Sequence, residues 1–111
     1  MKTRAVRVKL KPGSLGRVRE WAAEITRRHD EALVTLRDET IYLEAFFLDQ
    51  AADGDYLVGV ITAESFKTSK AAVERSLHDI DAYHKQFQQD TWESGKPLEL
   101  LVHLARLDEL V

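Results

Sequence analysis

Apolar residues recur at two different periods along this chain, and the order of those periods restricts the fold more than any other feature. Between Thr3 and Leu10, apolar side chains alternate with basic or small ones, which is typical of a half-buried strand. From Leu15 to Leu36 they recur every three or four residues, which predicts one helix of about six turns. The breaker Lys11-Pro12-Gly13-Ser14 separates the two elements, and Ser14 is suited to cap the helix.

A strand pair follows the helix. Thr40 to Leu48 is rich in Ile, Tyr and Phe, and Tyr56 to Ala63 is the returning strand. Between them Ala52-Asp53-Gly54-Asp55 is a strong hairpin signal.

The last part of the chain again combines a helical pattern with a strand. A second helical region begins near Ser65, and the polar stretch from Ser76 to Asp81 is expected to break it into two pieces or to lie within one helix. Gly95 is expected to end this region, Pro97 to open a strand edge, and Leu98 to Leu107 to form the final strand.

The resulting order of elements, βαββαβ, is compatible with few three-dimensional arrangements. Right-handed crossovers place both helical regions on one face of a four-stranded antiparallel sheet. The sequence therefore predicts an α+β, ferredoxin-like sandwich built as one domain over residues 1–111.

The opposite sheet face is expected to be partly apolar, because the strand Thr40 to Leu48 carries apolar side chains on both sides. A bare apolar face of this kind is usually an interaction surface. We therefore expect a homodimer in which two copies pack sheet to sheet as a dimeric α/β barrel.

Composition and charge limit the classes of protein to which this chain can belong. With 44% hydrophobic and 32% charged residues and no cysteine, the chain is typical of a globular domain without disulfides or thiolate metal sites. It offers neither a membrane helix nor a secretory signal, so we expect a cytoplasmic protein. The basic start of the chain has strand periodicity and no interleaved aromatic residue, so a nucleic-acid partner is not expected.

The order of motifs resembles a bacterial family of unknown function built on the dimeric α/β-barrel plan. The segments that carry the resemblance span nearly the whole chain: Val8-Lys9-Leu10-Lys11-Pro12-Gly13, Arg19-Glu20-Trp21, Tyr42-Leu43-Glu44, Asp53-Gly54-Asp55-Tyr56-Leu57, Ile80-Asp81 with His84, and Leu98-Glu99-Leu100-Leu101. The wider superfamily includes cofactor-free monooxygenases, haem-degrading enzymes and sugar mutarotases. The resemblance thus implies a pocket between the sheet and its helices.

A more distant likeness is to the L-rhamnose mutarotases. Arg27-Arg28-His29-Asp30-Glu31 matches a helical segment that carries a sugar-site histidine in those enzymes. Ile25 stands where a tyrosine is expected, and the later tryptophan-rich motif is missing. Of the functional residues that this likeness implies, only the sugar-site histidine has a counterpart in this chain, and it is His29.

Two histidines are the candidate catalytic groups. His29 and His84 occupy apolar-stripe positions on two helical segments that pack on the same side of the sheet. An imidazole with a pKa near 6.5 is suited to proton transfer, although core-edge histidines with satisfied nitrogens give the same pattern. Asp81, three residues before His84, is positioned to orient that ring.

Four further residues are the candidate ligand-binding groups. Glu44 places a carboxyl in an apolar strand, where it acts either as a base or substrate anchor beside Tyr42, or as the partner of a cation such as Arg7. His103 belongs either to this polar cluster or to the dimer face.

Metals and cofactors are not expected. The spacing of His78, Asp81 and His84 is too loose for one ion, and no dinucleotide or phosphate-loop motif is present. The sequence suggests cofactor-independent acid-base chemistry on a small organic ligand, such as mutarotation, isomerisation or lyase chemistry. The alternative is a non-catalytic dimeric module that binds a ligand or partner and whose histidines are structural.

Overall fold

A computed structural model describes residues 1–110 of the chain, so Val111 of the expected domain lies outside the described residues. The elements in chain order are β1 (Lys2–Leu10), α1 (Leu15–Arg27), α2 (His29–Asp38), β2 (Ile41–Ala51), β3 (Gly54–Ala63), α3 (Phe66–Arg75), α4 (Asp79–Thr91), β4 (Trp92–Pro97) and a short 3-10 helix, η1 (Leu107–Leu110).

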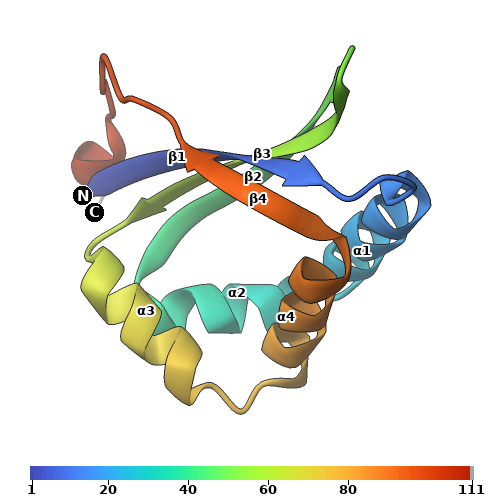
Figure 1. Cartoon of the computed structure of the whole chain (residues 1–111). Helices are drawn as coiled ribbons and strands as arrows, with labels where there is room; N and C mark the ends of the chain where they lie inside the picture. The colour runs from blue at the N-terminus through green and yellow to red at the C-terminus, as the bar shows by residue number, and fades with distance from the viewer. Residues whose placement is uncertain (111) are drawn as a thin grey trace.

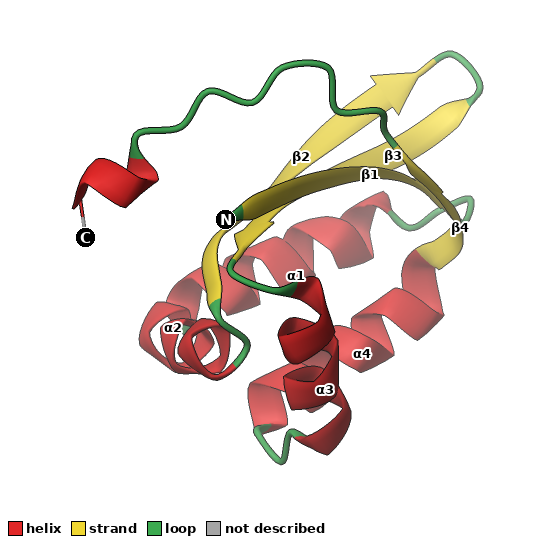
Figure 2. Cartoon of the chain, turned by 90° about the vertical axis from the view of Figure 1, so that its left-hand side faces the viewer, coloured by secondary structure: helices red, strands yellow, loops and turns green. Residues whose placement is uncertain are grey.

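The four strands form one antiparallel sheet in the order β2-β3-β1-β4. All four α-helices of the described chain lie on one side of this sheet (Figure 1, Figure 2). Each expected helical region is thus a pair of helices, and the α+β ferredoxin-like fold is confirmed. None of the described helices has the length and apolar character required to cross a membrane.

The periodicity predicted one continuous helix in the first helical region, but the structure has two helices there. Its backbone leaves the helical region at Arg28 (φ −98°, ψ 32°), and α2 begins at His29 in a new direction. The apolar stripe continues across the break, because side chains from both helices face the same cavity under the sheet. Apolar spacing records which residues face inward and is insensitive to a bend between them.

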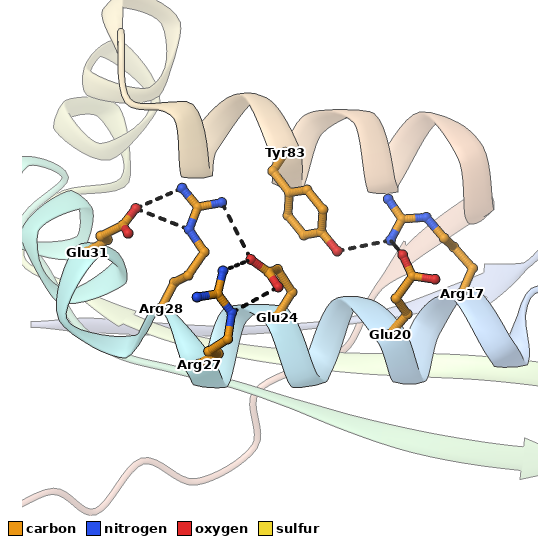
Figure 3. A network of polar contacts seen from close by, with 7 residues as sticks. All are labelled: Arg17, Glu20, Glu24, Arg27, Arg28, Glu31 and Tyr83. Carbon is orange, nitrogen blue, oxygen red and sulfur yellow. Dashed lines mark hydrogen bonds and ion pairs between the residues drawn. The ribbon is translucent and has the colours of Figure 1, made fainter.

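Ion pairs bracket this break (Figure 3). Arg27 binds Glu24 on α1, and Arg28 binds Glu31 on α2 with a 2.7 Å contact. On the same helix surface, Arg17 donates to the Tyr83 hydroxyl of α4 at 3.2 Å. Each surface pair of this kind contributes little to stability, because solvent and salt screen it. Their arrangement joins α1 to α2 and to α4.

The last strand was predicted at the wrong place. It is Trp92–Pro97, which follows α4 directly and pairs with the second half of β1. Gly95 accordingly lies inside β4 instead of ending the helical region, and Pro97 ends this edge strand instead of opening one. The segment Leu98 to Arg106 leaves the sheet and has no regular structure. The alternating pattern indicated a strand, but β4 pairs only with Val6 to Leu10 of β1, and the chain leaves that edge after the Leu98 amide bonds the Ala5 carbonyl.

The hairpin was predicted correctly, with Ala51 paired to Gly54 across a two-residue turn. The sequence left open whether the second helical region is broken, and the structure shows the break: α3 ends at Arg75 and α4 begins at Asp79. A bulge between Ile41 and Leu43 shifts the β2 register. The bulge places Ile41 with Glu44 and Phe46 on the helix side of the sheet, whereas strict alternation grouped it with Leu43.

The core lies between the sheet and the paired helices α1 and α4. Its fully buried members are Val8, Leu10, Val18, Trp21, Leu57 and Phe87. Trp21 stacks on Phe87 with 4.3 Å between ring centroids and meets Phe46 edge to face at 5.1 Å. Such aromatic contacts contribute about 0.5–1.5 kcal/mol beyond area burial. They fix α1, α4 and β2 relative to one another.

Candidate functional site

A large cavity opens beside this core, between the helix side of the sheet and all four helices. We call it the pocket; its volume is about 740 Å³. Most of its walls are apolar, and the apolar side chains include Val6, Trp21, Ile25, Leu33, Leu36, Ile41, Phe46, Ile61, Phe66, Val73, Ile80 and Trp92. This size and lining are typical of a site for a small organic molecule.

Three carboxyl groups line the pocket from three different elements. Glu39 follows the end of α2, Glu44 lies in β2, and Asp81 lies in the first turn of α4. Asp81 accepts a hydrogen bond from the Ser76 hydroxyl.

Glu39 is the most deeply placed of the three. The residue is only 6% exposed. Burial, followed by the charges of Asp81, Glu44 and Asp38, raises the pKa of Glu39 to about 7. Its carboxyl group is therefore suited both to give and to take a proton near neutral pH.

Glu44 reaches the same space from the sheet. Its side chain lines the pocket and is accessible to solvent, although neighbouring protein groups desolvate its carboxyl group. This desolvation, together with the Asp81 charge, raises the pKa of Glu44 above its ordinary value. The two glutamates therefore both tend to hold protons.

The backbone around Glu39 is strained. Thr40, which follows the Glu39 cap of α2, is in the left-handed conformation at φ 58°, where glycine is the usual residue. Its hydroxyl oxygen is buried without a hydrogen-bond partner among the described residues. The Ser69 hydroxyl of α3 donates to the Glu39 carbonyl oxygen at 2.5 Å. Strain that is held by surrounding contacts is common at functional sites.

His84 is held by its neighbours in one protonation form. The indole N–H of Trp21 donates to its Nδ1 at 3.1 Å. Because an indole N–H only donates, this nitrogen must accept, and the neutral ring carries its proton on Nε2. The Gln88 amide lies 2.9 Å from Nε2, and a half-turn of that amide presents its oxygen as acceptor. Burial lowers the pKa of His84 below its usual value.

Asp81 was expected to orient the His84 ring, but Trp21 and Gln88 orient it instead. The two ring nitrogens of His84 face Trp21 and Gln88. The Asp81 charge acts on His84 only by raising its pKa, in opposition to the larger effect of burial. The helix spacing indicated adjacency on α4 but not the indole approaching from α1.

His29 lines the same pocket, at its rim. It begins α2 directly after the break, its side chain is 69% exposed, and its Nδ1 lies 3.5 Å from Asp30. The structure thus brings both expected histidines to one cavity, with His84 inside and His29 at the entrance.

Three other expected site residues lie away from the pocket. Arg7 is on the opposite face of the sheet, where it binds Asp49 at 3.0 Å and stacks on Tyr56 at 3.5 Å. It is therefore not the partner of Glu44. This follows from the register, which places Arg4 rather than Arg7 on the helix side with Glu44.

Tyr42 and His103 make contacts outside the pocket as well. The exposed Tyr42 hydroxyl lies 3.5 Å from Glu64, at the β2 bulge. His103 Nε2 lies 2.9 Å from the Thr3 hydroxyl, beyond the end of β4. The polar cluster expected around Glu44 is therefore built from Glu39, Asp81 and His84 instead.

Glu39 is the main residue that the sequence reasoning missed, and a signal for it was present. It continues the apolar stripe at the same spacing, three residues after Leu36 and six after Leu33. A carboxyl at a stripe position should be buried. Trp21 and Gln88 had no comparable signal, because their contact with His84 depends on how α1 and α4 pack.

A smaller cavity of about 400 Å³ adjoins the pocket and shares Glu39 and Asp81 with it. Its outer wall holds Asp38, whose carboxylate lies 2.8 Å from His78 Nε2. That hydrogen bond raises the pKa of His78. Within the described residues, no group of three or more His, Asp or Glu side chains is arranged to hold a metal ion.

Fold and pocket together define a ferredoxin-like α+β sandwich with a ligand-sized cavity between sheet and helices. The chain belongs to a family of unknown function, DUF6176, whose model matches residues 1–109. It is also similar to the crystal structure of protein Atu4242 from Agrobacterium tumefaciens, with a TM-score of 0.59 and 12% identity over 88% of this chain and 89% of that one. That likeness concerns the fold alone. No curated protein matches the chain.

Proposed function

We propose that this protein catalyses cofactor-independent proton transfer on a small organic molecule with an apolar body. The observation that carries the proposal is that Glu39, Glu44 and His84 line one largely apolar cavity. The apolar walls accommodate the body of the ligand and exclude water from the polar end. Mutarotation, isomerisation and lyase chemistry all need only groups of this kind.

The three groups take different roles in this proposal. Glu39, with a pKa of about 7, is the group that gives or takes the proton. Glu44 anchors the ligand or acts as the second carboxyl group. His84 is neutral and has its donor proton on Nε2, because Trp21 occupies Nδ1, and a bound ligand accepts that proton's hydrogen bond in place of the Gln88 amide. His29 at the rim and Asp81 beside the carboxyl pair complete the polar end.

Hydrogen–deuterium exchange gives a direct test of this chemistry. The protein is incubated in deuterated buffer with small alkyl and aryl ketones, and exchange at the carbon next to the carbonyl is followed by NMR. L-rhamnose, followed by its anomer exchange, represents the sugars. We expect acceleration of one of these probes by the wild type and its loss in Glu39→Gln, which keeps the shape of the side chain.

The matched control is Glu93→Gln, at an exposed glutamate of β4. It should keep the wild-type rate. If wild type, Glu39→Gln and buffer alone exchange all probes equally, the catalytic proposal fails.

A second function is favoured by one observation. Both nitrogens of His84 face protein partners, as expected for a structural histidine. In that case the pocket binds its ligand without turnover. Saturation of the pocket by a probe, seen as a concentration-dependent rise in Tm, without any exchange would identify a binding module.

A further inference from the structure

One arginine faces the pocket without an acidic partner. Arg4 lies on the helix side of β1 and lines the pocket beside Phe66, the first residue of α3. Its guanidinium carbon lies 4.0 Å from the centroid of the Phe66 ring. Among the side chains that the structure describes, no carboxylate forms an ion pair with Arg4. A charged, stacked group at the wall of the pocket is therefore left for a ligand to bind.

The other face of β1 shows the same arrangement in a complete form. Arg7 stacks on Tyr56 at 3.5 Å, and its Nε and Nη2 donate to a carboxylate oxygen of Asp49 at 3.1 and 3.0 Å. Arg4 has the aromatic ring but not the carboxylate. The group that completes the arrangement on the pocket side is therefore a carboxylate that comes from outside the described chain.

A lysine adds positive charge to this part of the pocket. Lys70 follows Phe66 by four residues on α3, so the two side chains lie on the same side of that helix. Lys70 also lines the pocket and forms no ion pair with the described side chains. The other basic side chains of the pocket, Lys85 and His29, belong to α4 and α2. An anion on Arg4 is therefore attracted by the Lys70 charge as well.

The carboxyl groups of the pocket belong to a different part of its wall. Arg4 pairs with Ile61 in the strand register, and Ile61 pairs with Glu44, so β3 lies between the arginine and the glutamate. Neighbouring strands are about 4.8 Å apart, which separates these two backbones by roughly 10 Å. Arg4 is also not among the charges that shift the pKa of Glu39 or Glu44. The pocket is thus basic at one place and acidic at another, with the apolar Ile61 between them.

We propose that the pocket binds an organic monocarboxylic acid, whose carboxylate accepts hydrogen bonds from the Arg4 guanidinium and whose apolar body fills the cavity. A guanidinium presents its N–H donors in a planar fork that matches the two oxygens of a carboxylate. Stacking on Phe66 orients that fork before the ligand arrives, which lowers the cost of binding. The proposal rests on the proposed function, because it names the substrate class for the same pocket. The part of the ligand that reaches the glutamates is then the part that reacts.

Three probes with the same alkyl chain and different head groups test the choice of ligand. They are decanoate, decylamine and decan-1-ol, titrated near neutral pH into the full chain. Both tryptophans of the chain, Trp21 and Trp92, line the pocket, so their fluorescence reports its occupancy. We expect decanoate to bind about tenfold more tightly than decan-1-ol, as one charge-assisted pair allows. Decylamine should bind no more tightly than the alcohol.

Variants of Arg4 test where the carboxylate binds. Arg4→Met keeps an apolar side chain over Phe66 and removes the charge, so the affinity for decanoate should fall about tenfold while that for decan-1-ol is unchanged. Arg4→Lys keeps the charge without the fork and should lose about threefold, which preserves the test if Arg4→Met fails to fold. Arg19→Met, at an exposed arginine of α1 outside the pocket, is the matched control and should keep the wild-type affinities.

Four results overturn the proposal. Tighter binding of decylamine than of decanoate shows that the glutamates select the ligand, and equal affinity for all three probes shows that the apolar walls alone do. The same decanoate affinity in the Arg4 variants and in Arg19→Met shows that Arg4 takes no part. Absence of a fluorescence change with every probe shows that the pocket does not take this class of ligand. Decanoate binding that depends on Arg4, without proton exchange on any ketone or sugar probe, refutes the catalytic function and leaves the ligand class standing.

Discussion

The indole N–H of Trp21 and Nδ1 of His84 are joined by a 3.1 Å hydrogen bond between α1 and α4. The two rings also lie 5.6 Å apart, centroid to centroid, beside Phe87 and Phe46. The bond satisfies a buried indole donor and fixes the tautomer of an imidazole at the pocket wall. Stability and site geometry therefore depend on the same contact.

The protonation form of His84 follows from this bond. We expect ¹⁵N NMR to show the Nε2–H tautomer and a pKa below 6.5, the direction in which burial shifts it. Trp21→Phe should raise this pKa, because protonating Nδ1 then breaks no hydrogen bond. A ring protonated on Nδ1 in the wild type would contradict the assigned donor and acceptor.

The two histidines should differ in their effect on stability. His84→Ala leaves the indole N–H of Trp21 without its acceptor, so we expect a loss of about 2 kcal/mol in the free energy of unfolding. His29→Ala removes an exposed side chain and should change it by less than about 0.5 kcal/mol. Urea denaturation of both variants makes the comparison, and equal losses would show that the Trp21 contact contributes little.

Glu39 should make stability depend on pH. The folded state holds the Glu39 proton up to about pH 7, whereas the ordinary pKa is 4.5. Between these values the folded state binds more protons than the unfolded chain, so the free energy of unfolding falls as pH rises. Glu39→Gln should remove this fall and gain on the order of 2 kcal/mol at pH 8.

Urea denaturation at pH 5, 6, 7 and 8 measures this effect. Glu93→Gln, at an exposed position, serves as the control and should keep the wild-type profile. If Glu39→Gln keeps it as well, the Glu39 carboxyl is not desolvated in the way the structure indicates.

Thr40 offers a test of stored strain. Thr40→Gly relieves the left-handed backbone at φ 58° and removes a buried unpaired hydroxyl, so we expect a gain of about 1 kcal/mol. Thr40→Ala removes the same hydroxyl but keeps a Cβ in the left-handed region, and it should gain less. Thermal unfolding of both variants separates the two contributions. Equal gains would place the cost in the hydroxyl alone.

His78 should titrate above its ordinary value, because its hydrogen bond to Asp38 stabilises the protonated ring. The stabilisation is present below the ordinary pKa of 6.5 and is lost as pH rises through the folded pKa. Asp38→Asn should lower the NMR-measured pKa of His78. Asp30→Asn, an exposed aspartate beside His29, should leave the His78 pKa unchanged.

The sheet and its helical layer were predictable because apolar periodicity reports local burial directly. The strand Thr3 to Leu10 and the hairpin at Gly54 both appear where their residues indicated. The same reasoning failed for Leu98 to Leu107, since an alternating pattern indicates which residues can form a strand but not where along the neighbouring strand the pairing stops.

Part of the candidate site also followed from the sequence by itself. Glu44 and His84 stood out because a carboxyl or an imidazole at an apolar position requires a local explanation, and both line the pocket. Tertiary structure decided the rest. The registers of β1 and β2 against β3 placed Arg7 and Glu44 on opposite faces of the sheet, and the packing of α1 on α4 put Trp21 rather than Asp81 on His84. The Trp21–His84 and Arg7–Asp49 contacts join residues 63 and 42 positions apart, so their geometry arises only when the elements pack.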